Sequence, residues 1–371
     1  MGLLENGGGD KIQVENTAAE LRKLGVEIDI KSGLNTDMAG YDLIHIFQLD
    51  WSPESYFYTK QAKELGKPIV LSPIHHSVAE LKKFDEEYVF DYRRLTKYMF
   101  RNQFHRDTYK DVYRTIFDPV HLKPTIYSIF KGLQNMNRDT IRWSDYVLVQ
   151  TEKEAEDLKT TYEVDFKWSI VPNGVSKNFI NNSHYQNALG INEYILCVGR
   201  IEPRKNQLSV IEAVKRLRKE TGLDLKLVLV GVKSSRKHVE YILRFNSSLK
   251  KNKWVIHISK VPYEEMPSYC HFAKVGVSAS WFETTGLTSL EALFSGTNAV
   301  ASGERAKEYL GDQASYCKPE DIDSIKDAIK KEYFAPRPVV TDKMLSSYTW
   351  ENAAKKTFEV YNQVLKKEVT L

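Results

Sequence analysis

The chain has 371 residues, of which 42% are apolar, and a formal net charge of +4 at pH 7. This length exceeds what one hydrophobic core usually organises, so we expect a packed globular protein of two domains. The charge is too small to indicate nucleic-acid binding. The chain contains no long apolar run, and its first residues lack the apolar core of a signal peptide. We therefore expect a protein that neither spans a membrane nor is exported.

The three cysteines, Cys197, Cys270 and Cys317, stand at unrelated positions. They form neither a metal-ligand spacing nor an even-numbered disulfide framework. Cys197 also lies inside an apolar run. These features favour a reducing, cytoplasmic location. Peripheral attachment to the inner face of a membrane stays open, because local basic segments favour anionic surfaces.

The first half of the chain alternates helices with short apolar strands. Helical spacing after the glycines at 7–9 predicts a first helix, and a second is expected over 54–65. The predicted strands are 26–30, 43–47, 69–72, 146–149 and 168–171. Thr151, followed by Glu154 three positions later, predicts a capping box at the start of another helix. Strands that alternate with helices indicate a parallel sheet covered on both faces.

The turn Pro172-Asn173-Gly174 separates this half from a second one with the same alternation. Its predicted strands are 194–198, 226–230, 254–258, 275–278 and 299–302. Its predicted helices are 207–220, about 264–272 and one from about Gly286. We therefore predict an α/β protein with two doubly wound, Rossmann-like domains facing an interdomain cleft, over residues 1–172 and 173–346, followed by a helix over 347–371. Ligand groups should lie at the carboxyl ends of the strands.

Residues 93–131 interrupt this alternation. The segment is rich in Tyr and Phe and holds nine Lys or Arg against three Asp. We interpret it as a helical insertion. Its aromatic residues are either the core face of solvated helices or, together with the basic residues, a surface for an anionic ligand.

The most specific signal is the stretch 280–292, SWFETTGLTSLEA, which follows a strand and enters a helix. Gly286 relaxes the turn, and the free amides of a helix start attract an anion by about 0.3–1 kcal/mol per favourable interaction. The pattern indicates a diphosphate site, with Glu283 facing an attached sugar and Glu291 accepting hydroxyl hydrogens from a ribose. In the alternative interpretation, Glu283 caps the helix and Glu291 is a solvated helical residue.

The second signal is the stretch 197–206, CVGRIEPRKN, again a strand that runs into a loop and a helix. Gly199 permits close approach of the backbone. Arg200 and Lys205 would supply two cations to a leaving diphosphate, since Arg can bind phosphate oxygens bidentately and Lys acts as a point charge. In the alternative interpretation, both are surface charges around a turn.

Together these two stretches resemble the retaining family 4 glycosyltransferases, which are group 1 glycosyl transferases of the GT-B fold. The shared features are the Gly-Arg…Lys loop, the segment from Glu283 to Glu291 and the linker 170–175, IVPNGV. The N-terminal glycine loop and the histidine-containing strand over 42–47 also match. Residues 348–351, YTWE, match the start of a helix that crosses back to the first domain.

This resemblance implies an enzyme, a retaining hexosyltransferase of cell-surface polysaccharide biosynthesis. It would move a sugar from a UDP- or GDP-sugar to a hydroxyl of a saccharide or lipid-linked acceptor by same-face substitution. Residues 1–172 would bind the acceptor, 173–346 the nucleotide sugar, and 93–131 would lie on the acceptor side. The resemblance implies no cofactor, no metal and no nucleic-acid partner. A sugar-nucleotide epimerase of the same fold and a nucleotide-sugar-binding protein without turnover remain alternatives.

Residue by residue, the resemblance assigns the sugar to Glu283 and the ribose to Glu291. It assigns the diphosphate to two cations, three helix-start amides and two glycines of the other domain: Arg200, Lys205, Gly286, Leu287, Thr288, Gly8 and Gly9. After the strand at 69–72, such enzymes have one histidine or acidic residue near the anomeric carbon. Here two residues, His75 and His76, fit that position. A structural role for these histidines is the alternative.

Two further features bear on these assignments. The family has a full apolar strand before its glycine loop, whereas residues 1–4 offer only a short one, so the first strand is short or truncated. Asp321 and Asp323 match the Asp-x-Asp metal pattern of other glycosyltransferases. They follow Pro319 and open a helix, so we expect helix capping instead of metal binding.

Overall fold

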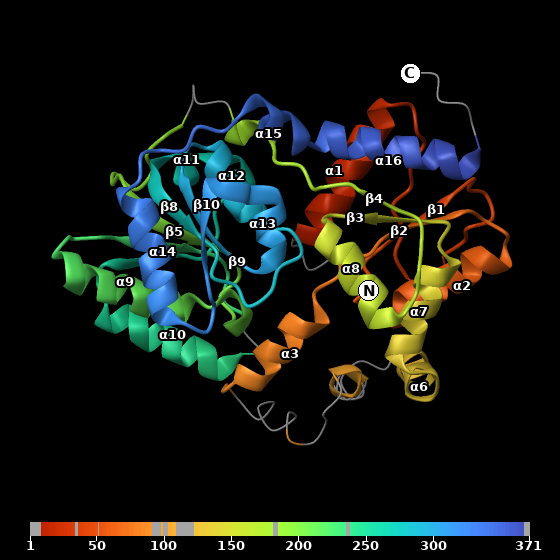
Figure 1. The fold of residues 1–371 in the computed structure, drawn as a ribbon, viewed down its shortest axis with the longest axis horizontal. Helices are drawn as coiled ribbons and strands as arrows, with labels where there is room; N and C mark the ends of the chain where they lie inside the picture. Colours follow the sequence, from red (N-terminus) through yellow and green to blue (C-terminus); the bar gives the residue numbers. More distant parts are fainter. Residues whose placement is uncertain are drawn as a thin grey trace. The chain divides into compact units, whose positions relative to one another are not determined.

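The computed structural model describes residues 9–33, 36–50, 52–90, 98, 103–108, 122–180, 185–234 and 238–366 (Figure 1). The chain divides into two compact units. Unit 1 holds Met1–Ala79, Thr96–Gly174 and Tyr348–Leu371, and unit 2 holds Glu80–Leu95 and Val175–Ser347. None of the helices in the described ranges is long and apolar enough to cross a lipid bilayer.

Unit 1 is built on a parallel sheet in the order β1-β2-β3-β4. The strands are β1 (Ile44–Phe47), β2 (Ile69–Ser72), β3 (Tyr146–Val149) and β4 (Trp168–Ile170). The helices described around it are α1 (Gly9–Lys23), α2 (Ser52–Glu64), α6 (Leu122–Lys131), α7 (Leu133–Trp143), α8 (Glu152–Tyr162) and α16 (Trp350–Leu365). The apolar runs at 69–72 and 146–149 thus form strands as predicted.

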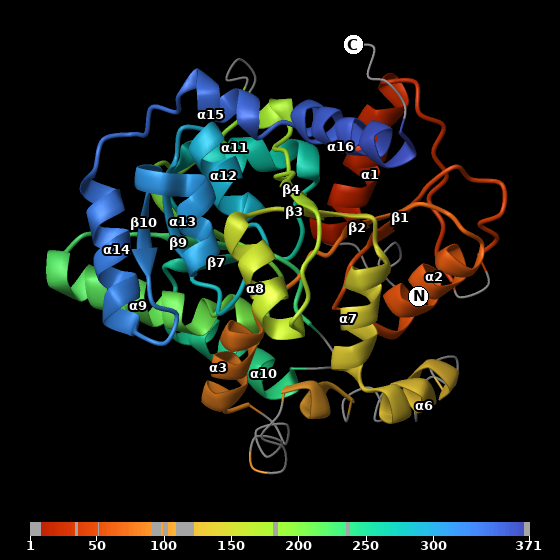
Figure 2. The same cartoon turned by 45° about the vertical axis from the view of Figure 1, so that its right-hand side comes forward.

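Alternate residues of these strands face two separate cores. Ile69, Leu71 and Val147 pack in one cluster with residues of α7 and α8. Val70 and Leu148 point the other way and pack with residues of α1 and α16. Successive side chains of a strand point to opposite faces of the sheet. Because each face is covered by helices, the residues on both faces are apolar. Figures 1 and 2 show α1 and α16 side by side.

The strand predicted over 26–30 does not form. Val26–Ile30 has an irregular backbone, and the carbonyl of Ile28 accepts a hydrogen bond from the Arg22 guanidinium, 2.7 Å away. A strand needs a neighbouring strand for its backbone hydrogen bonds. In the described part of the chain, β1 is the edge of its sheet and pairs only with β2. Residues 26–30 therefore have the composition of a strand, but no neighbouring strand of the described chain pairs with them.

Unit 2 contains a six-stranded parallel sheet in the order β10-β9-β8-β5-β6-β7. The strands are β5 (Tyr194–Val198), β6 (Leu227–Val230), β7 (Val255–Ile258), β8 (Ala273–Val277), β9 (Asn298–Ser302) and β10 (Ala314–Cys317). Its longer helices are α9 (Gln207–Thr221), α10 (Val239–Lys251), α11 (Met266–Phe272), α12 (Leu287–Phe294), α13 (Glu304–Leu310), α14 (Ile322–Phe334) and α15 (Asp342–Ser347). The two sheets confirm the predicted α/β class.

The strand order of unit 2 reverses between β5 and β8. From β5 the chain proceeds outward through β6 to β7, and then crosses to β8 and proceeds outward the other way. In open α/β sheets, ligands bind beyond the carboxyl ends of the strands at such a reversal. The loops that follow β5 and β8 are the two stretches with the most specific sequence signals.

Helix α3 (Val78–Glu87) packs mainly within unit 2, although the sequence-based boundaries put residues 80–95 in the first domain. The ring of Phe84 lies 5.8 Å from that of Trp281 and 5.6 Å from that of Phe282. Lys83 also pairs with Glu320 at 2.5 Å. These aromatic contacts place α3 with unit 2, although its neighbours along the sequence belong to unit 1.

Three other predictions concern the helical insertion, the C-terminal helix and the linker. Residues 103–108 and α6 are helical, as expected for an insertion at 93–131, while Arg93, Arg94, Lys97 and Arg101 lie outside the described residues. Thr349 caps α16, which belongs to unit 1 as predicted. A Cβ on Gly174 would lie 2.2 Å from the Trp350 amide nitrogen, so only glycine fits in the linker there.

Candidate functional site

Two glycines bring the ends of β5 and β6 into contact. Gly199 and Gly231 have φ angles of 146° and 153°, and a Cβ on Gly231 would lie 2.1 Å from the Gly199 carbonyl oxygen. Side chains are therefore excluded from this part of the carboxyl edge. The loop after β5 continues to Asn206, whose amide donates to the carbonyl oxygens of Ala279 (3.2 Å) and Pro319 (2.7 Å). These bonds attach the β5 loop to the β8 loop.

Glu283 lies in a cluster of cations where these two loops meet. Lys205 forms a hydrogen-bonded ion pair with its carboxylate, and Arg204 lies 3.8 Å from the other carboxylate oxygen. The Trp281 amide also donates to the Arg204 carbonyl oxygen at 2.9 Å. Burial raises the pKa of Glu283, but the charges of Lys205 and Arg204 outweigh it and lower the pKa to about 2. Glu283 is therefore ionised at neutral pH.

The structure separates the two cations that the sequence analysis paired. Lys205 contacts Glu283, whereas Arg200 keeps 53% of its side chain exposed, with its Nε 3.9 Å from Glu202. Arg204, which the sequence analysis missed, occupies the second position beside Glu283. The available signal was that Arg204 adjoins Lys205 in a short 3₁₀ turn, Pro203–Lys205.

The start of α12 contradicts the helix-cap interpretation of Glu283. Gly286 is the N-cap residue, and the Glu283 carboxylate contacts Lys205 and Arg204. The Gly286 amide donates to the Tyr309 hydroxyl at 2.7 Å, and the Leu287 amide donates to the Thr285 carbonyl at 2.8 Å. The amides of Gly286, Leu287 and Thr288 were expected to bind a diphosphate. Those of Gly286 and Leu287 already have acceptors within the chain.

Glu291 is buried, which contradicts its interpretation as a solvated helical residue. A Cβ on Gly276 of β8 would lie 2.7 Å from the Cβ of Ala292, so α12 packs directly on the sheet beside Glu291. Its Oε1 accepts a hydrogen bond of 3.0 Å from the Tyr263 hydroxyl. Burial raises the pKa of Glu291 to about 7, although the Tyr263 hydrogen bond lowers it.

Unit 1 contains a second cluster, in which one carboxylate holds both predicted histidines. Asp50 Oδ1 lies 2.5 Å from His75 Nδ1, and Asp50 Oδ2 lies 2.6 Å from His76 Nδ1. The loop before them is strained, because Ile74, a β-branched residue, has a φ angle of +44°. Burial raises the pKa of Asp50, but His75 and His76 outweigh it and hold the pKa well below its usual range.

The two histidines differ in their surroundings. The His75 side chain is only 2% exposed, and its amide donates to Glu154 Oε1 at 2.8 Å. The His76 side chain is 20% exposed. Thr151 accepts from the Glu154 amide as predicted, but the Glu154 carboxylate contacts the amides of His75 and Gln150 instead of completing the capping box. Asp50 was missed from the sequence, since nothing local marks it.

The comparisons with known proteins match the donor-side residues. The family described as "Glycosyl transferases group 1" matches residues 181–333, which contain Lys205, Glu283 and Glu291. Residues 181–333 are therefore similar to the group 1 glycosyl transferases. The O-antigen chain mannosyltransferase B of Escherichia coli is 29% identical over 174 residues, 45% of this chain and 45% of that enzyme. The match thus spans less than half the length of this curated relative.

Solved structures extend the likeness to nearly the whole chain. Sucrose-phosphate synthase from Thermosynechococcus elongatus has a TM-score of 0.63 at 16% identity, over 88% of this chain and 74% of that one. HepE from Anabaena, in complex with UDP and glucose, has a TM-score of 0.56 at 12% identity, over 94% and 77%. At such identities these structures show the fold alone, which is GT-B. The predicted GT-B fold is confirmed, and the predicted group 1 family matches residues 181–333.

Other polar residues that the sequence analysis singled out have structural roles. His45 is partly buried, and its ring nitrogens contact the hydroxyls of Tyr361 (2.7 Å) and Ser72 (2.9 Å). Burial lowers the pKa of His45 to about 3, so it is neutral. Asp321 caps α14 by accepting from the Asp323 and Ser324 amides, as predicted. No group of three or more His, Cys, Asp or Glu is placed to hold a metal within the described ranges.

Of the two N-terminal glycines assigned to the diphosphate, only Gly9 is among the described residues. Gly8 lies outside the described residues, and Gly9 begins α1, where a Cβ would enter open space. The three cysteines are free thiols, and all are buried. Cys197 lies near Lys205 and Glu283, and Cys270 lies near Glu291.

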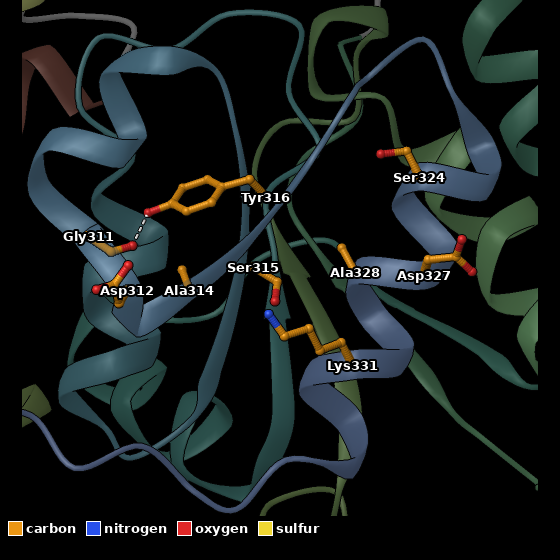
Figure 3. Close-up of a pocket in the computed structure, with 9 residues that line it drawn as sticks. All are labelled: Gly311, Asp312, Ala314, Ser315, Tyr316, Ser324, Asp327, Ala328 and Lys331. Atoms are coloured by element: carbon orange, nitrogen blue, oxygen red, sulfur yellow. Dashed lines mark hydrogen bonds between the residues drawn. The ribbon is translucent and has the colours of Figure 1, made fainter.

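Two hollows lie elsewhere on the units. Figure 3 shows one of about 610 Å³ between β10 and α14, lined by residues such as Ser315, Tyr316 and Lys331. The Tyr316 hydroxyl donates to the Gly311 carbonyl there at 2.5 Å. The other, of about 830 Å³, lies along the open edge of β1 in unit 1. None of the residues assigned to the donor lines either hollow.

Proposed function

We propose that the chain is a retaining, metal-independent glycosyltransferase that moves a hexosyl group from a UDP- or GDP-sugar to a hydroxyl of a saccharide or lipid-linked acceptor. The observation that carries the proposal is a pair of carboxylates, Glu283 partly buried and Glu291 buried, at the strand-order reversal of a domain that matches the group 1 glycosyl transferases. Glu283 there has two cations beside it, and Glu291 has none within ion-pair distance in the described residues.

In this proposal, the β5 loop neutralises the leaving diphosphate. Lys205 and Arg204 lie at Glu283, and the exposed Arg200 guanidinium is available to a phosphate from the same loop. Fixed cations in a partly buried site stabilise developing negative charge more strongly than they would in water. Gly286, Leu287 and Thr288 would add amides at the start of α12. For two of them, the donor would have to replace an internal acceptor.

Glu283 would act on the sugar and not as a proton donor. Its low pKa keeps it ionised, so it cannot protonate a leaving group at neutral pH. An ionised carboxylate stabilises the positive charge that grows on the sugar ring as the anomeric carbon–oxygen bond to phosphate breaks. The acceptor oxygen bonds to that carbon on the same face, and its proton passes to the leaving phosphate oxygen. No other co-reactant is needed.

On the acceptor side, we assign the group near the anomeric carbon to His76, with Asp50 as its positioning residue. His75 is buried and fixed by Asp50 and by Glu154, whereas His76 has an exposed edge. Because Asp50 contacts the Nδ1 of His76, the Nε2 would be the ring nitrogen that contacts a substrate hydroxyl. Asp50 would thereby orient the His76 ring.

Peripheral contact with an anionic membrane is the location that we propose, at its cytoplasmic face. Helix α6 exposes four large apolar residues, Leu122, Ile126, Ile129 and Phe130, the last at 87%. It lies within the segment with nine Lys or Arg against three Asp. An apolar face next to basic residues binds anionic lipid surfaces. The printed name of the Escherichia coli relative, an O-antigen chain mannosyltransferase, supports cell-surface polysaccharide as the product class.

The test of this function is a hydrolysis assay with labelled UDP- and GDP-sugars. We expect slow release of free sugar with the anomeric configuration of the donor, lost in Glu283→Gln and kept in Glu304→Gln, which changes an exposed glutamate of α13. An isomerised sugar nucleotide would instead identify an epimerase. Binding without any product would identify a protein that only holds the nucleotide sugar.

A further inference from the structure

The environment of Glu291 differs from that of Glu283, which has two cations beside it. No cation of the described residues lies within ion-pair distance of Glu291. The titratable groups that face it are the phenol of Tyr263 and the thiol of Cys270 on α11. Burial raises the pKa of both groups above their usual values, so both are neutral. Tyr263 therefore supplies the one polar contact by which the described structure holds Glu291.

Tyr263 is fixed by the elements around it. It begins the 3₁₀ turn Tyr263–Glu265, directly after Pro262 and the loop that follows β7. Its ring lies 5.7 Å from the ring of Phe179, which is fully buried. The ring is partly buried, and its hydroxyl points to Glu291 Oε1 at 3.0 Å. This packing places the hydroxyl before any ligand arrives.

We propose that Tyr263 is a positioning residue for the nucleotide ribose, holding one oxygen of the Glu291 carboxylate so that the other faces the ribose hydroxyls. This inference rests on the proposed function, because it assumes that a nucleoside diphosphate binds at α12. A carboxylate held at one oxygen loses less rotational freedom when the second oxygen binds a ligand. The loop after β7 and helix α12 then act together on the nucleoside.

A pH dependence follows from this contact. Burial raises the pKa of Glu291 to about 7, and the Tyr263 hydrogen bond lowers it. Ribose hydroxyls donate more strongly to an ionised carboxylate, so nucleotide affinity should rise as the pH increases through about 7. Without the Tyr263 hydroxyl, the pKa of Glu291 rises further, and the increase in affinity should occur at a higher pH. A tyrosine that only supported the fold would leave this pH profile unchanged.

The experiment compares Tyr263→Phe with the unaltered full-length chain by calorimetric titration between pH 6 and 9. The probes are UDP, GDP and inorganic pyrophosphate. At pH 7 we expect nucleoside-diphosphate affinity to fall by roughly 3- to 10-fold, the scale of one hydrogen bond. The midpoint of its pH profile should move upward, and pyrophosphate affinity should stay unchanged. Glu291→Gln should leave only the pH dependence that arises from ionisation of the phosphates, which the pyrophosphate titration measures.

Tyr194→Phe is the matched control, because it removes a hydroxyl that donates only to the Tyr269 carbonyl, at 2.7 Å. It should leave all three affinities and the pH profile unchanged. An unshifted pH profile in Tyr263→Phe, with nucleoside diphosphate still bound, overturns the positioning role alone. If neither UDP nor GDP binds to the unaltered chain, the proposed function fails, and the role of Tyr263 with it.

Discussion

Glu283 and Glu291 lie eight positions apart, and their charges are controlled in opposite ways. Glu291 is buried, and Glu283 is partly buried, with 16% of its side chain exposed. Glu283 has Lys205 and Arg204 beside it, and its pKa is lowered to about 2. Glu291 has only a tyrosine hydroxyl, and its pKa is raised to about 7. Burial acts on both in the same direction. The neighbouring charges, not the degree of burial, therefore decide which carboxylate is ionised at neutral pH.

The comparison extends to function. A carboxylate that is always ionised can stabilise positive charge during the reaction at any physiological pH. A carboxylate with a pKa near 7 binds hydroxyl groups best once it is ionised. The first property suits a sugar whose charge changes during transfer. The second suits a ribose that is held throughout.

The largest effect should come from Glu283→Gln. Removing an interaction that strengthens as charge develops lowers turnover by roughly 10² or more. We expect this loss in kcat for transfer or donor hydrolysis, with Glu304→Gln as the exposed control. Near-normal turnover in Glu283→Gln would show that its charge does not act on the reaction.

The second effect is on stability. Glu291 has a folded pKa of about 7 against an ordinary value of 4.5, so its ionisation destabilises the fold as pH rises from about 4.5 to 7. The difference corresponds to on the order of 3 kcal/mol. Glu291→Gln should therefore unfold at higher denaturant concentration than the unaltered chain at pH 8, and not at pH 4. Equal stability at pH 8 would contradict a raised pKa.

The low pKa of Glu283 has the opposite sign. Its ion pairs contribute stability above pH 4.5, and this contribution is lost as pH falls towards about 2. Glu283→Gln should therefore weaken the fold at pH 7 and have little effect at pH 2. Denaturant unfolding of both variants over this pH range distinguishes the two environments in one series.

A smaller effect is expected on substrate affinity in Glu291→Ala. Loss of the ribose contact should raise the KM for the donor by roughly tenfold, since hydrogen bonds to charged groups contribute about 1.5–3 kcal/mol and part of this is offset by solvent. Turnover at saturating donor should change less than in Glu283→Gln. A fall in kcat with an unchanged KM would reverse the two assignments.

No effect at all is expected from metal removal. Arg204 and Lys205 already place positive charge where a metal ion would neutralise a diphosphate. Full activity should remain in excess chelator. Activity that is lost in chelator and restored by magnesium or manganese would contradict this, and Asp321 would then need a role besides its helix cap.

The sequence predicted those elements that local patterns determine. The apolar runs at 69–72, 146–149 and 194–198 form strands at those residues. The run at 26–30 has a similar composition but forms no strand, because strand formation depends on a pairing partner elsewhere in the chain. The helix caps at Thr151 and Asp321 also followed from local signals.

The candidate site was predicted in part, for the same reason. Glu283, Glu291 and Lys205 stand in motifs that can be recognised along the sequence. Their partners come from distant positions: Lys205 and Glu283 are 78 positions apart, and Tyr263 and Glu291 are 28 apart. Tyr263 carries no local signal that would pair it with a carboxylate. Such contacts require the fold.

The most direct test of the account is a measurement of nucleoside-diphosphate affinity in Glu283→Gln and Glu291→Gln beside the unaltered chain. UDP and GDP would be titrated into each protein at pH 8, where both glutamates of the unaltered chain are ionised. Because the bare nucleotide carries a ribose but no sugar, we predict near-normal affinity in Glu283→Gln and clearly weaker affinity in Glu291→Gln. Equal weakening in both variants, or normal affinity in Glu291→Gln, would contradict the division of roles between the two carboxylates.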